Sequence, residues 1–203
     1  LKGISFELEE GKILGIIGKN GSGKSTLLRA IAGIFSPDKG SINLHNNSVS
    51  LLSIGVGFNN KLTGYENIYL SGMLLGFSED EIKEKEKDII EFADIGKFIY
   101  KPVKTYSSGM YSKLAFAITA ILETDIILID EVLSVGDAKF KEKSYNKMKE
   151  LISDEKRTVV IVSHSLSTIR ELCDEVIWLN DGEIVDRGKP KDIIAKYNEF
   201  MGV

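Results

Sequence analysis

The sequence predicts an α/β fold: a mostly parallel β-sheet with a small antiparallel β subdomain and an inserted α-helical lobe. Three apolar runs rich in β-branched residues are typical of parallel strands covered on both faces: Ile13–Ile17, Ile126–Ile129 and Val159–Val162. Between the first and second runs, residues 62–123 have the apolar spacing of helices. A glycine-rich turn joins the first run to a helix, which is how a phosphate-binding core begins.

The composition is that of an ordinary globular protein. The chain has 203 residues, a formal net charge of −4, 43% hydrophobic and 28% charged residues. That length suits one large domain or a domain with an inserted lobe. The slight negative charge gives no reason to expect a nucleic acid partner. We expect no membrane span and no signal segment, because no apolar run approaches about 18 residues.

The first part of the chain alternates short strands with one helix. Residues Ile4–Leu8 alternate apolar and polar side chains, which predicts a half-exposed strand. The buried strand Ile13–Ile17 leads through the glycine-rich turn into a helix that starts near Thr26. Two further short strands are expected at Ser41–Leu44 and Val49–Leu52.

The helical lobe has clear start signals. Residues Ser78–Glu81 form a capping box, in which the first and last side chains satisfy each other's backbone N–H groups. Apolar residues follow at helical spacing: Ile82, Ile89, Ile90 and Ala93. A second helix is expected to begin near Ser108–Gly109. We interpret residues 1–203 as a single domain, with this lobe at about 62–123 inserted into its core.

The last part of the chain returns to buried strands. A helical segment near Glu142–Ile152 lies between two of them, which predicts a strand–helix–strand crossover. Residues 176–179 and 183–185 predict a closing hairpin around an Asn-Asp-Gly turn. Trp178 and the only cysteine, Cys173, are expected in the core. A single cysteine cannot form an internal disulfide, and such a chain suits a reducing cytosol.

The glycine-rich turn fits the phosphate-binding pattern G-x-x-x-x-G-K-[ST] and indicates a P-loop NTPase core. Its glycines let backbone N–H groups point inward around phosphate oxygens, and the helix N-terminus adds a positive dipole end. Lys24 is expected to reach the β- and γ-phosphates, and the Ser25 hydroxyl to ligate Mg²⁺. The predicted ATP-binding residues are Gly18, Lys19, Asn20, Gly21, Ser22, Gly23, Lys24, Ser25 and Thr26.

Acidic and imidazole side chains follow two of the predicted buried strands. Asp130 and Glu131 come after one strand, and His164 follows the next. Open α/β sheets bind ligands at the carboxyl ends of their strands. We expect Asp130 to hold Mg²⁺ with Ser25, and Glu131 to polarise the attacking water. His164 would contact the γ-phosphate or orient that water. An acidic pair that merely caps a helix is the alternative explanation for Asp130 and Glu131.

A second anion-binding element lies in the helical lobe. Ser107, Ser108 and Gly109 open a helix, where hydroxyls and unpaired N–H groups favour an anion. Two phosphate-seeking elements, well separated along one chain, suggest that one of them serves a second molecule.

The order of these motifs resembles the nucleotide-binding domain of an ATP-binding cassette (ABC) transporter over nearly the whole chain. Residues 106–110 read Tyr-Ser-Ser-Gly-Met where Leu-Ser-Gly-Gly-Gln is usual, and residues 134–137 read Ser-Val-Gly-Asp where Ser-Ala-Leu-Asp is usual. Together with Leu-Thr-Gly-Tyr-Glu-Asn-Ile at 62–68, these departures resemble the branch that exports cell-surface polymers. That branch includes exporters of teichoic acid, O-antigen and capsular polysaccharide.

The resemblance implies ATP and Mg²⁺ as cofactors and a homodimer of ATPase subunits. Each ATP would lie between residues 18–26 of one subunit and Ser107, Ser108 and Gly109 of the other. Asp137 would belong to the D-loop. Asn59, or its neighbour Asn60, would stand where the family has its Q-loop glutamine. The usual adenine-stacking aromatic would lie upstream of Leu1.

The resemblance further implies an integral membrane permease as partner and a peripheral location on the cytoplasmic face of the cell membrane. We therefore expect an ATP-hydrolysing subunit of a surface-polymer exporter. A cassette ATPase without a transport role would normally carry two cassettes, a coiled coil or a basic insertion. A small P-loop kinase would need a substrate pocket and a lid. A nucleotide sensor without catalysis would require an inert Glu131.

Overall fold

The structure is a computed structural model, which describes residues 1–52, 57–130, 137–154 and 156–202. The chain divides into two compact units. The sheet unit comprises residues 1–46, 125–131 and 154–203, and the helical unit comprises residues 47–124 and 132–153. The helical unit thus contains the expected lobe. The single-domain organisation stays a prediction.

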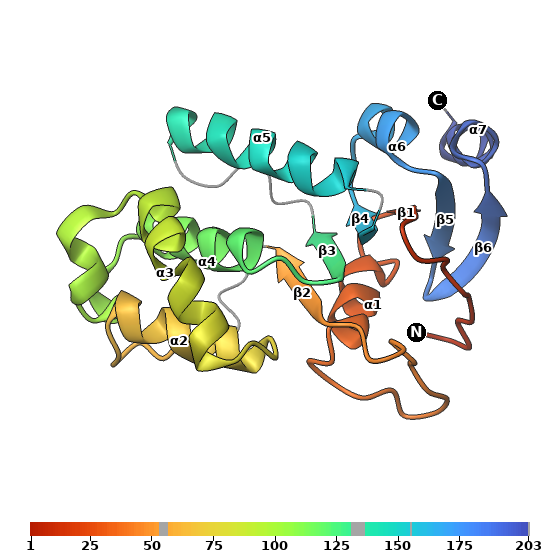
Figure 1. Cartoon of the computed structure of the whole chain (residues 1–203). Helices are drawn as coiled ribbons and strands as arrows, with labels where there is room; N and C mark the ends of the chain where they lie inside the picture. Colours follow the sequence, from red (N-terminus) through yellow and green to blue (C-terminus); the bar gives the residue numbers. More distant parts are fainter. Residues whose placement is uncertain (53–56, 131–136, 155, 203) are drawn as a thin grey trace. The chain divides into compact units, whose positions relative to one another are not determined.

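The strands of the sheet unit lie in the order β3-β4-β1-β5-β6. The first four are parallel, and β6 closes the sheet as an antiparallel hairpin partner of β5 (Figure 1). This confirms the predicted mostly parallel sheet and its antiparallel pair. The strands are β1 (Ile13–Ile17), β3 (Ile126–Asp130), β4 (Thr158–Val162), β5 (Glu175–Asn180) and β6 (Glu183–Gly188).

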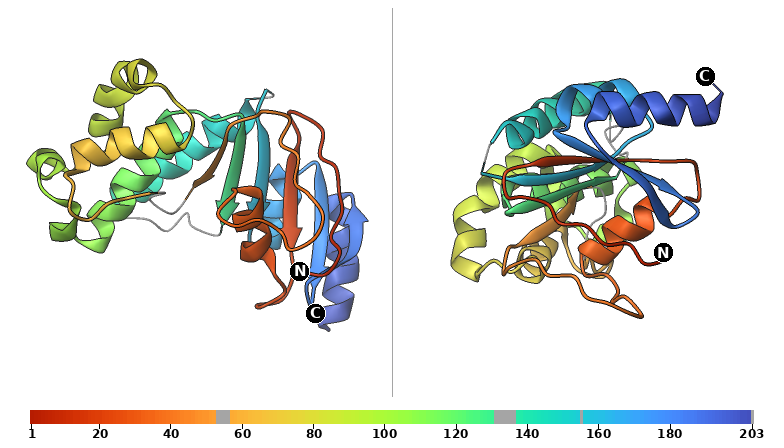
Figure 2. Two further views of the ribbon diagram at one scale, coloured as in Figure 1. Left: turned by 90° about the horizontal axis from the view of Figure 1, so that it is seen from below. Right: turned by 90° about the vertical axis from the view of Figure 1, so that its right-hand side faces the viewer.

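Helices cover both faces of this sheet. Helix α1 (Lys24–Ile31) lies on one face, and helices α6 (Leu166–Leu172) and α7 (Pro190–Met201) lie on the other (Figure 2, right). Because each face is covered, the side chains of β1 and β4 are buried on both sides, which explains their unbroken apolar runs. Cys173 and Trp178 are buried in this core, as predicted.

The elements of the helical unit are β2 (Val49–Leu52), α2 (Gly64–Leu74), α3 (Glu79–Ala93), the 3-10 turns Gly96–Tyr100 and Val103–Thr105, α4 (Ser108–Ile121) and α5 (Ala138–Ser153). In this unit, residues of α2, α3 and α4 and of the turn after α3 pack into an aliphatic core. The core residues are Ile68, Leu75, Ile82, Ile89, Ala93, Ile95, Ile99, Leu114, Ala117, Ile118 and Leu122. The capping box predicted at Ser78 starts α3, and a second one, which the sequence analysis did not identify, starts α2 at Thr63.

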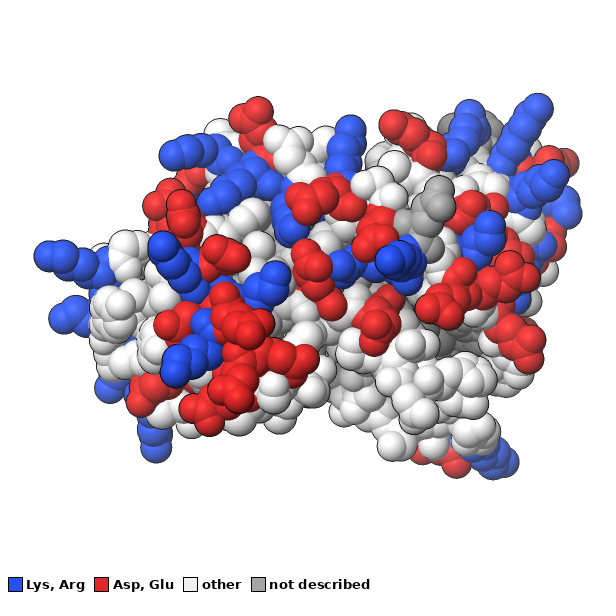
Figure 3. Space-filling view, in the orientation of Figure 1, with Lys and Arg blue, Asp and Glu red and all other residues white. Residues whose placement is uncertain are grey.

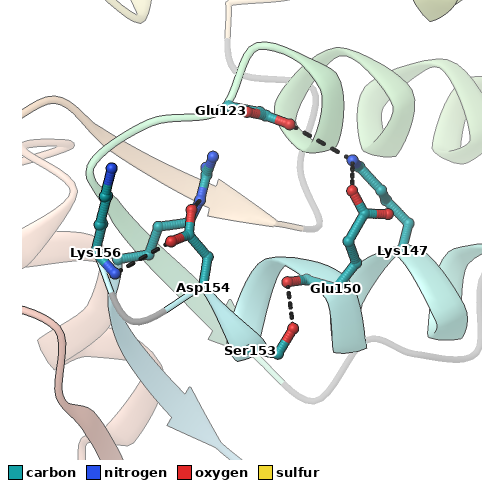
Figure 4. A network of polar contacts seen from close by, with 7 residues as sticks. Glu123, Lys147, Glu150, Ser153, Asp154 and Lys156 are labelled. Atoms are coloured by element: carbon teal, nitrogen blue, oxygen red, sulfur yellow. Dashed lines mark hydrogen bonds and ion pairs between the residues drawn. The ribbon is translucent and has the colours of Figure 1, made fainter.

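A lysine of helix α5 forms ion pairs within the helical unit (Figure 4). The Lys147 Nζ lies 2.8 Å from a Glu150 carboxylate oxygen and 3.5 Å from one of Glu123, at the end of α4. In the sheet unit, the turn before β4 is closed separately, because the Lys156 N–H donates to Asp154. Of these contacts, the ion pair between Lys147 and Glu123 joins α5 to the segment that follows α4.

Two of the predicted strands do not form in the structure. Residues 4–8 and 41–44 have no strand conformation. A strand requires a neighbour that pairs its backbone N–H and C=O groups. Alternation of side chains reveals a half-exposed segment but not whether such a neighbour exists. Among the described residues, neither segment joins a ladder.

Surface composition is mixed. On the face shown in Figure 3, Lys and Arg side chains are interspersed with Asp and Glu. Over the described residues, none of the helices is both long enough and apolar enough to cross a bilayer.

Candidate nucleotide-binding site

The phosphate-binding loop follows β1 and runs directly into α1. Gly23 is the N-cap of α1 with φ 104°, a left-handed conformation that suits glycine, and no side chain caps the helix. The first N–H groups of a helix have no carbonyl in a preceding turn to bind. The start of α1 therefore presents backbone donors and a positive dipole end to an anion.

Lys24 lies across the loop that it belongs to. Its side chain is buried, and Nζ donates to the carbonyl of Gly18 at 2.8 Å and to that of Lys19 at 2.9 Å. A buried ammonium needs such partners because desolvation is costly. The predicted lysine is therefore held by carbonyl groups of its own loop, at the start of α1.

The turn of the β5–β6 hairpin supports the loop from behind, which the sequence analysis did not foresee. A Cβ at Gly18 would lie 2.2 Å from the Leu179 carbonyl oxygen, so only glycine fits there. The Gly182 N–H donates to the Ser22 carbonyl at 3.0 Å. The Ser22 hydroxyl is buried and has no hydrogen-bond partner among the described residues. The loop is thus packed tightly on one side and carries an unsatisfied hydroxyl.

Three adjacent strands end beside this loop in matching register. Asp130 on β3 is opposite Val162 on β4, and Val162 is opposite Ile16 on β1. His164 follows β4 and is exposed. Neighbouring strands are about 4.8 Å apart, so one edge of the sheet gathers the loop, the His164 segment and Asp130 within about 10 Å. Glu131 lies outside the described residues.

The predicted Mg²⁺ ligands fit an ion that arrives with a nucleotide. Ser25 is partly accessible in the first turn of α1, and the carboxylate of Asp130 is partly accessible at the end of β3. The described residues contain no group of three or more His, Cys, Asp or Glu side chains that could hold a metal alone. Mg²⁺ commonly binds through one or two protein ligands plus phosphates and water, so a sparse set suits it.

The second predicted anion site is an exposed helix start in the helical unit. Ser107 is the N-cap of α4, and its hydroxyl accepts a hydrogen bond from the Met110 N–H at 3.2 Å. Ser108 is exposed, Gly109 is partly exposed, and no acidic residue lies in the first turn. This end of α4 can therefore accept an anion from outside the unit.

Asp137 is joined to the same helix by an ion pair that the sequence did not reveal. Its carboxylate lies 2.6 Å from Lys113 Nζ of α4 and accepts the Phe140 N–H at the start of α5. The Lys113 bond, followed by the Phe140 N–H, holds the pKa of Asp137 below its usual range. The predicted D-loop residue is thus held against α4.

Asn59 stabilises its own turn. Its side chain accepts the Lys61 N–H at 3.0 Å, and its N–H donates to the side chain of the fully buried Asn67 at 2.7 Å. Asn67 also donates to three backbone carbonyls of this segment, those of Asn59, Leu62 and Thr63. The sequence analysis did not identify Asn67. A buried amide requires hydrogen-bond partners of this kind, but the sequence does not show that Asn67 is buried.

Two buried side chains are structural. Burial raises the pKa of the Cys173 thiol to about 12, so it stays protonated. Trp178 contacts Tyr197 and Phe200 of α7, with ring centroids 5.6 Å and 5.0 Å away.

The chain is similar to proteins that are named as ATP-binding components of export systems. The teichoic acids export ATP-binding protein TagH of Bacillus anthracis is 48% identical over 201 residues, which are 99% of this chain and 36% of that protein. The O-antigen export system ATP-binding protein RfbB of Myxococcus xanthus is 43% identical over 203 residues, 100% of this chain and 46% of that protein. The chain thus spans less than half the length of these two relatives.

The fold agrees with solved structures. The dimeric structure of a bacterial ABC transporter cassette matches with a TM-score of 0.74 and 25% identity, covering 94% of this chain and 90% of that one. A model of the ABC transporter family matches residues 1–134, which include the phosphate-binding loop, Ser107–Gly109 and Asp130. Because this family model covers more than half of the sequence, the chain belongs to the ABC transporter family.

Proposed function

We propose that this chain binds and hydrolyses ATP as part of an exporter that moves a cell-surface polymer across the cytoplasmic membrane. The polymer class is teichoic acid or a lipid-linked polysaccharide. The relative from Bacillus anthracis is named for the export of teichoic acids, and the relative from Myxococcus xanthus for the export of O-antigen. The observation that carries the proposal is the common edge where the loop, the His164 segment and Asp130 meet.

The chemistry at that edge divides among a few residues. Lys24 neutralises the β- and γ-phosphate oxygens, and the N–H groups at the start of α1 hold the remaining phosphate charge. Ser25 and Asp130 would hold Mg²⁺, which supplies charge neutralisation between the phosphates when it is bound. Glu131 takes the proton of the attacking water, and His164 orients that water or contacts the γ-phosphate.

Two point variants separate binding from chemistry. Lys24→Ala should abolish high-affinity ATP binding, whereas Glu131→Gln should bind ATP but turn over ~10²–10⁴-fold more slowly, the usual contribution of a general base. Isothermal calorimetry and phosphate release measure the two quantities. A Glu131→Gln protein with wild-type turnover would refute the catalytic assignment.

We further propose that two copies share each ATP. Ser107–Gly109 of one copy would contact the phosphates held by residues 18–26 of the other, which explains an exposed anion site on the helical unit. Mixing Lys24→Ala with Ser107→Arg chains should restore one composite site and part of the activity, while each variant alone stays inactive. Absence of recovery, together with no ATP-dependent dimer of Glu131→Gln, would refute the shared site.

The membrane partner is proposed to be an integral permease. It would be contacted at the cytoplasmic face by the segment 59–66 and the adjoining helices of the helical unit. Cysteines placed at Lys61 or Tyr65 should cross-link to a cytoplasmic segment of the permease. Cross-linking that succeeds only from Lys189, in the sheet unit, would contradict this docking mode.

The transport role has its own test, distinct from ATP hydrolysis. Cells in which the protein carries Glu131→Gln should lose the surface polymer and accumulate its lipid-linked form inside. Normal surface polymer in such cells would favour a cassette ATPase without a transport role. Wall phosphate distinguishes teichoic acid from a phosphate-free polysaccharide.

A further inference from the structure

An aromatic side chain near the end of α7 lies against the phosphate-binding loop. The Phe200 ring centroid is 4.5 Å from the Lys19 Nζ, within the range of a cation–π contact. The same ring also contacts Trp178, at 5.0 Å between centroids. Trp178 is nearly fully buried at the end of β5, one residue before the carbonyl that supports Gly18.

Phe200 is half exposed in spite of its size. Its exposed fraction is 48%, while Tyr197 one turn earlier is 9% exposed. Phe200 lies on the same face of α7 as Ile193 and Tyr197, because side chains three or four residues apart share one face of a helix. It stands at the exposed end of that apolar face. Part of the Phe200 ring packs on Trp178, and its exposed part is open to a further partner.

Lys19 is the other half of the contact. It occupies the second position of the loop and is exposed. Among the described residues it forms no ion pair with a carboxylate, so its positive charge is not neutralised inside the sheet unit. An exposed lysine normally samples many rotamers, and ordering it costs side-chain conformational entropy.

We propose that Phe200 is a positioning residue for nucleotide binding, which holds the Lys19 ammonium beside the phosphate-binding loop. The ring restricts Lys19 to orientations near the loop, so part of the ordering cost is met before the nucleotide arrives. The ammonium is then available to the terminal phosphate of a bound triphosphate. This inference rests on ATP binding at the loop, and it adds a residue from α7 to that site.

The size of the effect follows from the contact. Cation–π contacts at exposed sites contribute about 0.5–1 kcal/mol, which corresponds to a roughly 2- to 5-fold change in affinity. Because the effect acts through a positive charge, it should be larger for ATP than for ADP and should shrink in high salt. Stacking of the ring on the base would instead affect both nucleotides equally and would be insensitive to salt.

A double-mutant cycle in the intact protein tests the inference. Dissociation constants for ATP and ADP are measured by calorimetry for the wild type, Phe200→Ala, Lys19→Met and the double variant. Phe200→Tyr keeps a ring and should bind ATP like the wild type. Met201→Ala is the matched control, since Met201 is adjacent on α7 and 41% exposed. Thermal denaturation of each variant verifies that it is folded.

The expected result is that Phe200→Ala weakens ATP binding about 2- to 5-fold and has no effect once Lys19 is Met. Equal weakening in both backgrounds, or equal weakening for ATP and ADP, would overturn the inference. Loss of affinity in Met201→Ala of the same size would also overturn it, because it would point to a general disturbance of α7. If the wild type itself fails to bind ATP, the proposed function fails. If the wild type binds ATP, but no more tightly than the Phe200→Ala variant does, the proposed function stands and only this inference fails.

Discussion

Replacing Gly18 with alanine tests whether the β5–β6 hairpin holds the phosphate-binding loop in place. The added Cβ would lie 2.2 Å from the Leu179 carbonyl oxygen, whereas close C···O contacts are about 3.3 Å, so the loop must move by about 1.1 Å. The obstacle is backbone in the sheet, which cannot rotate away as a side chain would. We therefore expect the loop, and not β5, to shift.

Two costs follow. Overpacking of this kind costs about 1–3 kcal/mol, and the positive φ adds about 1–3 kcal/mol of strain, so the free energy of unfolding should fall by about 2–6 kcal/mol. A displacement of about 1 Å at a reacting group can reduce turnover by about 10²-fold. ATP hydrolysis should therefore fall at least that far, even where the protein remains folded.

Gly33→Ala is the matched control. Gly33 also has a positive φ, +72°, but a Cβ there meets nothing within 4 Å, so only the strain cost of about 1–3 kcal/mol remains. Urea denaturation and phosphate release on both variants separate the two costs. If Gly18→Ala matches Gly33→Ala in stability and turnover, the hairpin does not fix the loop and the reasoning is wrong.

Three further predictions concern the helical unit. Ser78→Ala removes the capping box of α3 and should lower the free energy of unfolding by about 0.5–2 kcal/mol in urea denaturation. Hydrogen bonds from two tyrosines, with Tyr69 contributing most, hold the pKa of Glu86 below its ordinary value of 4.5. Its stabilisation is thus present above that value and lost as the pH falls through the folded-state pKa. Urea midpoints of wild type and Glu86→Gln should differ at pH 6 and converge towards pH 3; a constant gap would contradict this linkage. Lys113→Met frees Asp137 from α4 and should lower kcat with no change in the Kd for ATP, since neither residue belongs to the phosphate-binding loop. A raised Kd would show that the pair acts on binding instead.

Local sequence patterns predicted those elements whose amino-acid composition already shows how they must be packed. An unbroken apolar run such as Ile13–Ile17 is stable only when both faces are covered, so it identifies a central strand. The same logic located Asp130 at a strand end. The strand predicted at residues 4–8 does not form. A strand needs a neighbouring strand to pair with, and an alternating pattern does not show whether one exists.

The contacts that the sequence did not predict join residues distant along the chain. Leu179 behind Gly18 and Phe200 beside Lys19 depend on how β5 and α7 pack around the loop. No motif records such packing, because any backbone carbonyl or aromatic ring could provide it. The ion pair between Lys113 and Asp137 has the same character, since it depends on the approach of α5 to α4.

Trp178 gives the chain an intrinsic optical reporter. It is the single tryptophan among 203 residues, so the fluorescence of this chain on excitation near the red edge of indole absorption comes from one buried ring. That ring contacts Phe200. The next residue along β5, Leu179, provides the carbonyl behind Gly18. A change in its emission or in its quenching by iodide therefore reports movement at the nucleotide loop or at the end of α7. Stopped-flow recordings can follow those movements in real time without an attached label.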